Sequence, residues 1–172
     1  MKILGIDPGY ERLGIAILEK PARNEFHSGG NKGDKKETVL FSECFKTSSK
    51  LEFNERLSLV GIEIKNIIKK WKPEILAIET LFLNTNQKTV MQVAEVRGVI
   101  IYEASINGLK IFEASPPQIK LATTGYGRAT KEQIIKMVKI LVDKKNPKNN
   151  AKESDDELDA IAIALTAFAH MR

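Results

Sequence analysis

The order of short apolar runs and amphipathic segments is the strongest constraint on the fold of this chain. Strand-like patterns of apolar residues fall at residues 3–7, 14–20, 38–46, 74–79 and 109–114. Apolar residues at helical spacing occupy 52–71 and 86–106, and Lys72-Pro73 ends the first of these segments. Three strands, a helix, a strand, a helix, a strand and further helices predict an α/β fold with a five-stranded mixed sheet flanked by helices.

Three further helices are predicted from capping signatures, in which a Ser or Thr is followed three residues later by Glu or Gln. They begin at Ser115, Thr130 and Ser154. The first also has prolines in its opening turn, which suits the first turn of a helix.

The chain of 172 residues fits one domain, and we find neither a repeat nor a composition shift that would divide it. We therefore predict a single domain over residues 1–172. Residues 21–37 are rich in Gly, Lys and Asn and nearly free of apolar residues, so we expect a flexible loop there.

Charge, cysteine content and the first apolar run limit which partners, disulfide bonds and cellular compartment we expect. The net charge of +5 permits a polyanionic partner without requiring one. The single cysteine, Cys44, excludes an internal disulfide. The apolar run that opens the chain is too short for a signal peptide or a membrane span, so we expect a cytoplasmic protein without membrane contact.

Two acids close apolar strands. Asp7 ends the first strand directly before Pro8-Gly9, and Glu79 ends the run at 74–79. Ligands of α/β sheets bind at the carboxyl edge, where both side chains would lie. Each acid alone is as readily explained by a lysine partner or a helix cap, because an unpaired buried charge is costly.

A third element adds two more acids. Asp156 and Asp159 are three residues apart and share one face of the helix that starts at Ser154. Acids in a first turn also complement the helix dipole, which accounts for Asp155 and Glu157. It accounts less well for Asp159, which borders the apolar run at 160–163.

Four acids on three elements could hold one or two divalent cations. Mg²⁺ prefers oxygen ligands and needs few carboxylates when phosphate supplies the rest. Two such ions can activate water and stabilise the leaving oxygen in phosphodiester cleavage. His27 and His170 offer no Ser-His-Asp arrangement, since one lies in the polar loop and the other close to residue 172. We therefore predict a Mg²⁺-dependent nuclease.

Five motifs in order along the chain resemble the RuvC family of Holliday-junction resolvases. They are Gly5-Ile-Asp-Pro-Gly9, Ala77-Ile-Glu79, Val96-Arg-Gly-Val99, Gly125-Tyr-Gly-Arg-Ala-Thr-Lys131 and Asp156-Glu-Leu-Asp-Ala-Ile-Ala-Ile-Ala164. Each is weak alone, but their order and spacing are specific. The loop at 21–37 is longer than is usual for the family.

The resemblance implies an RNase H-like fold and a homodimer that nicks two symmetric strands of a four-way DNA junction in recombination and repair. It implies that Asp7, Glu79, Asp156 and Asp159 bind the metal, with two Mg²⁺ per site and Mn²⁺ as a substitute. It places the ligand at Asp156, while the neighbouring Asp155 could assist. It further implies a bacterial source and a branch-migration helicase complex as partner.

DNA-binding residues also follow from the resemblance. It implies that Lys120 and Lys131 contact phosphates and that Phe82 stacks on unpaired bases at the junction centre. Arg128 belongs to the same basic stretch, since residues 115–148 hold eight basic against two acidic residues. Lys131 opens a helix, where a cation opposes the dipole, so a nearby anion would explain it.

Three alternative functions remain open. A strand followed by Asp-x-Gly also occurs in actin-like ATPases, but these clamp a nucleotide between two such domains. A related RNase H-like nuclease could act on RNA or on other branched DNA. A catalytically inactive nucleic-acid-binding module is the third alternative, and the four acids argue against it.

Overall fold

The computed structural model describes residues 1–20, 36–81, 87–144 and 153–171, and the chain forms an α/β fold as expected. The expected loop at 21–37 lies outside the described residues except for its last two positions. Phe82 also lies outside them. In chain order the elements are β1 (Lys2–Asp7), β2 (Arg12–Glu19), β3 (Glu37–Lys46), α1 (Phe53–Trp71), β4 (Ile75–Glu79), α2 (Gln87–Ile106), β5 (Lys110–Ala114), α3 (Pro116–Thr124), α4 (Lys131–Leu141), β6 (Val142–Lys144) and α5 (Asp155–His170).

The sheet is mixed, and its strand order is β5-β4-β1-β2-β3-β6. β1 pairs in parallel with β4, and β4 with β5, whereas β2 runs antiparallel to both β1 and β3. The carboxyl ends of β1, β4 and β3 therefore share one edge of the sheet with the start of β2. Asp7 and Glu79 both lie at this edge, as the sequence predicted.

The expected count of five strands was wrong, because the sheet has six strands among the described residues. The additional strand, β6, is three residues long and pairs in parallel with the start of β3 through Val142 and Glu37. Three residues are too few to show a strand pattern, and Leu141-Val142 continues the apolar spacing of α4. Pairing with the open edge of β3, far away in the sequence, creates this strand.

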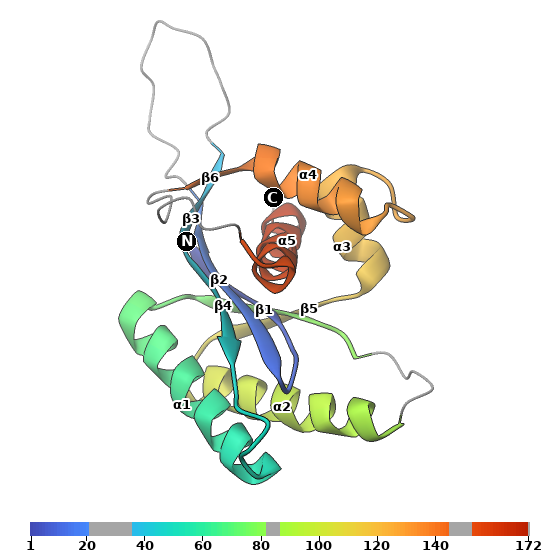
Figure 1. Cartoon of the computed structure of the whole chain (residues 1–172). Helices are drawn as coiled ribbons and strands as arrows, with labels where there is room; N and C mark the ends of the chain where they lie inside the picture. Colours follow the sequence, from blue (N-terminus) through green and yellow to red (C-terminus); the bar gives the residue numbers. More distant parts are fainter. Residues whose placement is uncertain (21–35, 82–86, 145–152, 172) are drawn as a thin grey trace, which may run out of the picture.

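Helices cover both faces of the sheet (Figure 1). α1 and α2 pack on one face around Ile64, Ile100 and Ile78. α5 lies on the other face, flanked by α3 and α4, and is buried almost all round from Ala160 to Phe168. The buried run that the sequence places after Asp159 is therefore the contact of α5 with the sheet.

The predicted capping boxes are confirmed at all three helices. Ser115, Thr130 and Ser154 cap α3, α4 and α5, and a Gln or Glu three residues later bonds back to each cap. The end of α1 is also fixed locally, since Lys72 adopts a left-handed conformation with φ of 51° and its N–H bonds to Ile68. Because Ser154 sets the start of α5, it also sets where the acids of its first turns lie.

Two glycines let α5 approach the sheet closely. A Cβ on Gly5 would lie 2.2 Å from the carbonyl oxygen of Ala160, and one on Gly14 would lie 2.1 Å from that of Asp156. Neither position can hold a side chain without moving the helix. Gly14 pairs with Asp7 across β1 and β2, so the start of α5 is held directly against the strand end that carries Asp7.

Within the ranges that the structure describes, no helix is both long and apolar enough to cross a lipid bilayer.

Candidate active site

The acids at the carboxyl edge of the sheet form the centre of the site. Asp7 is the last residue of β1, and Glu79 is the last residue of the neighbouring β4. Parallel pairing places both strand ends on the same side of the sheet. Because Gly14 has no Cβ, the backbone of α5 can lie directly beside these strand ends. Two acids that are far apart in the sequence thereby come to lie beside the first turns of α5.

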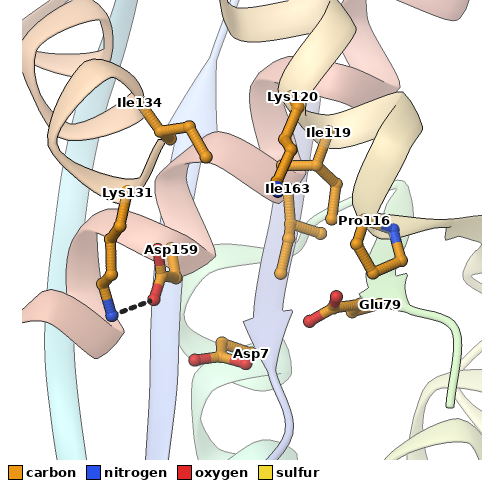
Figure 2. Close-up of a pocket in the computed structure, with 9 residues that line it drawn as sticks. All are labelled: Asp7, Glu79, Pro116, Ile119, Lys120, Lys131, Ile134, Asp159 and Ile163. Atoms are coloured by element: carbon orange, nitrogen blue, oxygen red, sulfur yellow. Dashed lines mark ion pairs between the residues drawn. The ribbon is translucent and has the colours of Figure 1, made fainter. Parts of the chain in front are cut away.

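One pocket contains three of the four predicted acids (Figure 2). Its cavity measures about 240 Å³ and is lined by Asp7, Glu79, Pro116, Ile119, Lys120, Lys131, Ile134, Asp159 and Ile163. The carboxylates of Asp7 and Glu79 lie at its base, and Asp159 descends from α5 above them. Apolar side chains of α3, α4 and α5 close the rest of the wall, which strengthens electrostatic interactions inside.

The Asp7 carboxyl is strongly perturbed. Its pKa is raised from 3.8 to about 7, first by burial and then by the negative charges of Asp159, Glu79 and Asp156. Lys131 opposes this rise but is outweighed. A carboxylate that is destabilised by three other acids is a strong acceptor of a cation, because a cation removes the repulsion that raises its pKa.

Glu79 and Asp159 are affected in the same direction. Burial and the charge of Asp159 raise the pKa of Glu79. Burial also raises the pKa of Asp159, and the hydrogen bond and charge of Lys131 offset this only in part. The Lys131 Nζ lies 3.1 Å from Asp159 Oδ2 and 3.5 Å from Asp155 Oδ2. These carboxylates are the anions that the position of Lys131 at the start of a helix led us to expect.

Asp156 is oriented differently from the other three acids. It does not line the pocket; its Oδ2 accepts hydrogen bonds from Arg12 Nε at 2.8 Å and from the Cys44 thiol at 3.3 Å. Arg12 Nη2 also pairs with the same oxygen. Burial raises the pKa of Asp156, but these hydrogen bonds and the Arg12 charge outweigh it, and the pKa is lowered overall.

The donor set fits a hard divalent cation in its chemistry. The pocket offers only carboxylate oxygens as anionic groups, and these are the preferred ligands of Mg²⁺. Over the part of the chain that the structure describes, no three His, Cys, Asp or Glu side chains gather closely enough to ligate one ion. Two of the four acids have cationic partners instead, since Asp159 pairs with Lys131 and Asp156 pairs with Arg12.

The predicted DNA-binding residues divide into three groups. Lys120 and Lys131 line the pocket on α3 and α4, beside the acids. Arg128 is exposed in the connection between these two helices and does not line the pocket. Phe82 lies outside the described residues, so its stacking role stays a prediction.

Two arginines that we did not predict from the sequence also contact the site. Arg12 contacts Asp156, and Arg97 donates from Nε to the carbonyl oxygen of Glu79 at 3.1 Å while pairing with Glu113. Arg97 therefore fixes the strand end that carries Glu79. A signal existed for Arg97, which lies inside one of the five motifs, but local pattern gives no sign that Arg12 meets a helix 144 positions away.

Comparisons with known proteins point to one family along nearly the whole chain. The family described as "Crossover junction endodeoxyribonuclease RuvC" matches residues 3–167. A protein of that name from Halothermothrix orenii is 39% identical over 165 residues, which cover 96% of this chain and 90% of the relative. The structure of Thermus thermophilus RuvC superimposes with a TM-score of 0.83 at 28% identity, covering 100% of this chain and 96% of that one. The same protein in complex with a Holliday junction substrate gives a TM-score of 0.83 at 27% identity, covering 100% and 95%.

Proposed function

Because this chain belongs to the RuvC family of crossover junction endodeoxyribonucleases, we propose that its acidic pocket is the active site of a Holliday junction resolvase. The RNase H-like fold expected from the sequence is confirmed by the Thermus thermophilus structure. The observation that carries the proposal is the meeting of Asp7, Glu79 and Asp159 in one pocket beside two lysines. Metal-dependent cleavage of a phosphodiester uses both features, since the lysines would bind the phosphate and the acids would hold the catalytic metal.

Family membership makes the enzyme a divalent-metal-dependent nuclease, and we propose Mg²⁺, with two ions per site and Mn²⁺ as a substitute. Asp7, Glu79 and Asp159 would hold the cations, and Asp156 would join them after leaving Arg12. When bound, such cations lower the pKa of a coordinated water and stabilise charge on the leaving oxygen. Ile119, Ile134 and Ile163 would form the apolar wall beside this chemistry.

The lysines have a separate task in this proposal. Lys120 and Lys131 would neutralise phosphate oxygens of the strand that enters the pocket, and Arg128 would contact the backbone farther from it. Lys131 pairs with Asp159, which holds its ammonium beside the acids, where it could also meet a phosphate oxygen. Phe82 would stack on unpaired bases at the junction centre.

We also propose that residues 1–172 act as a single domain and that two copies assemble through α2. The outward face of this helix carries Met91 and Tyr102, which are 64% and 62% exposed and lie three turns apart. Between them Gly98 leaves open space, where a second helix could approach closely. Val99 packs instead toward Gly61 of α1, so it belongs to the interior of the subunit.

The cellular setting follows from relatives. Halothermothrix orenii and Thermus thermophilus are the sources of the matched proteins, and we propose a bacterial cytoplasm and a role in recombination and repair for this chain. A branch-migration helicase complex as partner stays a prediction of the same kind.

A substrate panel tests the function. The protein is incubated with a synthetic four-way junction, a linear duplex of the same sequence and an RNA–DNA hybrid, each with Mg²⁺ or with EDTA. We expect paired, symmetric nicks in the junction only, and no cutting in EDTA. Equal cutting of hybrid and junction would favour the related RNase H-like nuclease, and undiminished cutting in EDTA would refute the metal site.

A variant tests the residues. Asp7→Asn removes one metal ligand but leaves the lysines in place, so cleavage should fall at least about 100-fold while junction binding in EDTA stays close to wild type. Asp143→Asn, on the exposed edge strand β6, is the matched control and should cut normally. A near wild-type rate for Asp7→Asn would contradict the assignment.

A further inference from the structure

The side chain of Asp156 does not line the pocket, and its carboxylate accepts hydrogen bonds from Arg12 and Cys44. A Cβ on Gly14 would lie 2.1 Å from the carbonyl oxygen of Asp156 and 3.1 Å from the Cβ of Asp7. The backbone of Asp156 therefore lies next to the strand end that carries Asp7. The charge of Asp156 also helps to raise the pKa of Asp7, so this carboxylate acts on the acidic pocket although it does not line it.

The backbone of Arg12 is held in place by contacts that do not involve Asp156. The turn before it is anchored by Arg56, which is 7% exposed and donates from Nη2 to the carbonyl oxygen of Tyr10 and from Nε to Thr47 Oγ1, both at 2.9 Å. Thr47 Oγ1 in turn donates to the Tyr10 carbonyl oxygen at 2.8 Å. Arg12 then starts β2 opposite Lys46. The fold thus fixes the backbone of Arg12 at this edge independently of Asp156, and the guanidinium donates to Asp156.

The Arg12 side chain remains open to a second anion. Half of its surface is exposed, whereas Asp156 is 22% exposed. Both Nε and Nη2 donate to the same Asp156 oxygen, an arrangement that a phosphate reproduces, because guanidinium binds phosphate through paired N–H donors. Arg12 starts β2 at the edge of the sheet where Asp7 and Glu79 end, so its exposed guanidinium lies on the same edge as the acidic pocket.

We propose that Arg12 is a positioning residue that holds Asp156 away from the pocket in the free protein and releases it when a DNA phosphate takes its place. The fourth carboxylate then joins the other three only when substrate is bound. This inference rests on the proposed function, since it concerns the same pocket. By linkage, DNA raises the affinity for the divalent cation, and the cation raises the affinity for DNA by the same factor.

The first measurement is Mg²⁺ binding to the free protein by isothermal titration calorimetry, without DNA. Arg12→Ala frees Asp156 and should lower the Kd for Mg²⁺ about fivefold or more, within the usual range of such couplings. Loss of a positive charge would itself favour a cation, so Lys46→Ala, which removes one from the same edge, measures that effect. Arg12→Lys keeps the charge without the forked donor and should fall between wild type and Arg12→Ala.

The decisive comparison is a double-mutant cycle with Asp156→Asn. If Arg12 acts through Asp156, Arg12→Ala improves Mg²⁺ binding only while Asp156 is present. An improvement of equal size in the Asp156→Asn background, or one matched by Lys46→Ala, would overturn the proposal.

Junction binding provides a readout of opposite sign. In EDTA, fluorescence anisotropy with a labelled four-way junction should show weaker binding by Arg12→Ala, with a salt dependence reduced by about one phosphate contact. Damage to the fold would weaken Mg²⁺ and junction binding together, whereas this proposal requires them to change in opposite directions. Unchanged junction affinity would refute it.

The two proposals fail differently. Mg²⁺ binding by the wild type with no response to Arg12→Ala overturns only the role of Arg12. A wild-type protein that binds no Mg²⁺ and cuts junctions in EDTA overturns the metal site, and the role of Arg12 with it.

Discussion

Replacing Asp7 by Asn should make the metal-free protein more stable while abolishing its activity. At ~1.4 kcal/mol for each pKa unit, the rise from 3.8 to about 7 makes ionised Asp7 cost the folded state about 4 kcal/mol. Asparagine is nearly the same size and carries no charge, so the variant escapes this penalty. An imperfectly hydrogen-bonded amide in this site destabilises the variant by about 1 kcal/mol or more. The expected net increase in the free energy of unfolding is therefore about 2–3 kcal/mol at pH 8.

The sign of this effect depends on pH in a defined way. The folded-state pKa of Asp7 lies above its unfolded value, so the folded protein binds more protons and the wild type loses stability as pH rises from about 4 to about 7. Below about pH 4 Asp7 is protonated in both states, and the charge penalty disappears. The difference in free energy of unfolding between variant and wild type should therefore grow between about pH 4 and about pH 7 and stay constant above about pH 7.

The assay is urea unfolding followed by circular dichroism in EDTA, at several pH values from 4 to 8. A gain of about 2–3 kcal/mol corresponds to roughly 4–12 °C in Tm for a chain of this size. Asp143→Asn, which removes a carboxylate from the exposed strand β6, should stay within about 0.5 kcal/mol of wild type. An unchanged or lower free energy of unfolding for Asp7→Asn at pH 8 would refute the reasoning about the acidic pocket.

Three further substitutions test contacts around the site. Lys131→Ala should weaken junction binding and reduce its salt dependence by about one phosphate contact, as measured by anisotropy from low to moderate salt; an unchanged slope would place this lysine away from DNA. Gly14→Ala would force a Cβ to 2.1 Å from the carbonyl oxygen of Asp156 and should cost about 3 kcal/mol or prevent folding, which thermal unfolding would report, whereas a wild-type Tm would contradict it. Arg56→Met removes the donors to the Tyr10 carbonyl oxygen and to Thr47 Oγ1 and should lower the free energy of unfolding by about 2 kcal/mol in urea. An unshifted midpoint would show that the turn is held by other contacts.

Local signals predicted most of the fold. The capping boxes at Ser115, Thr130 and Ser154 depend on residues three positions apart, and all three formed where expected. The ends of β1 and β4 were likewise predicted from apolar runs that stop at Asp7 and Glu79. In each case the determining residues lie within one element or its immediate flank.

Features that depend on distant pairing were not predicted from pattern. β6 exists because three residues meet the open edge of β3, and a register shift in β3 between the partners of Ile17 and Leu18 turns Val39 to the α5 face and Phe41 to the α1 face. The partners of Asp156 are of the same kind, since Arg12 and Cys44 lie 144 and 112 positions away in the sequence. Spacing along a helix gives the face on which an acid lies but not the partner that it meets.

The same logic explains why the pocket carries its own cations. Burial first, and then the charges of neighbouring acids, raise the pKa values of Asp7, Glu79 and Asp159, and an uncompensated fourth charge in the pocket would destabilise the fold further. Lys131 neutralises part of this charge at Asp159, and Arg12 draws Asp156 out of the cluster. In the proposed mechanism, metal and DNA would replace these two resident cations, and each would do so more easily after the other has bound. A resolvase of this kind would assemble its full set of ligands on the substrate, which would restrict metal-dependent cutting to the DNA that it holds.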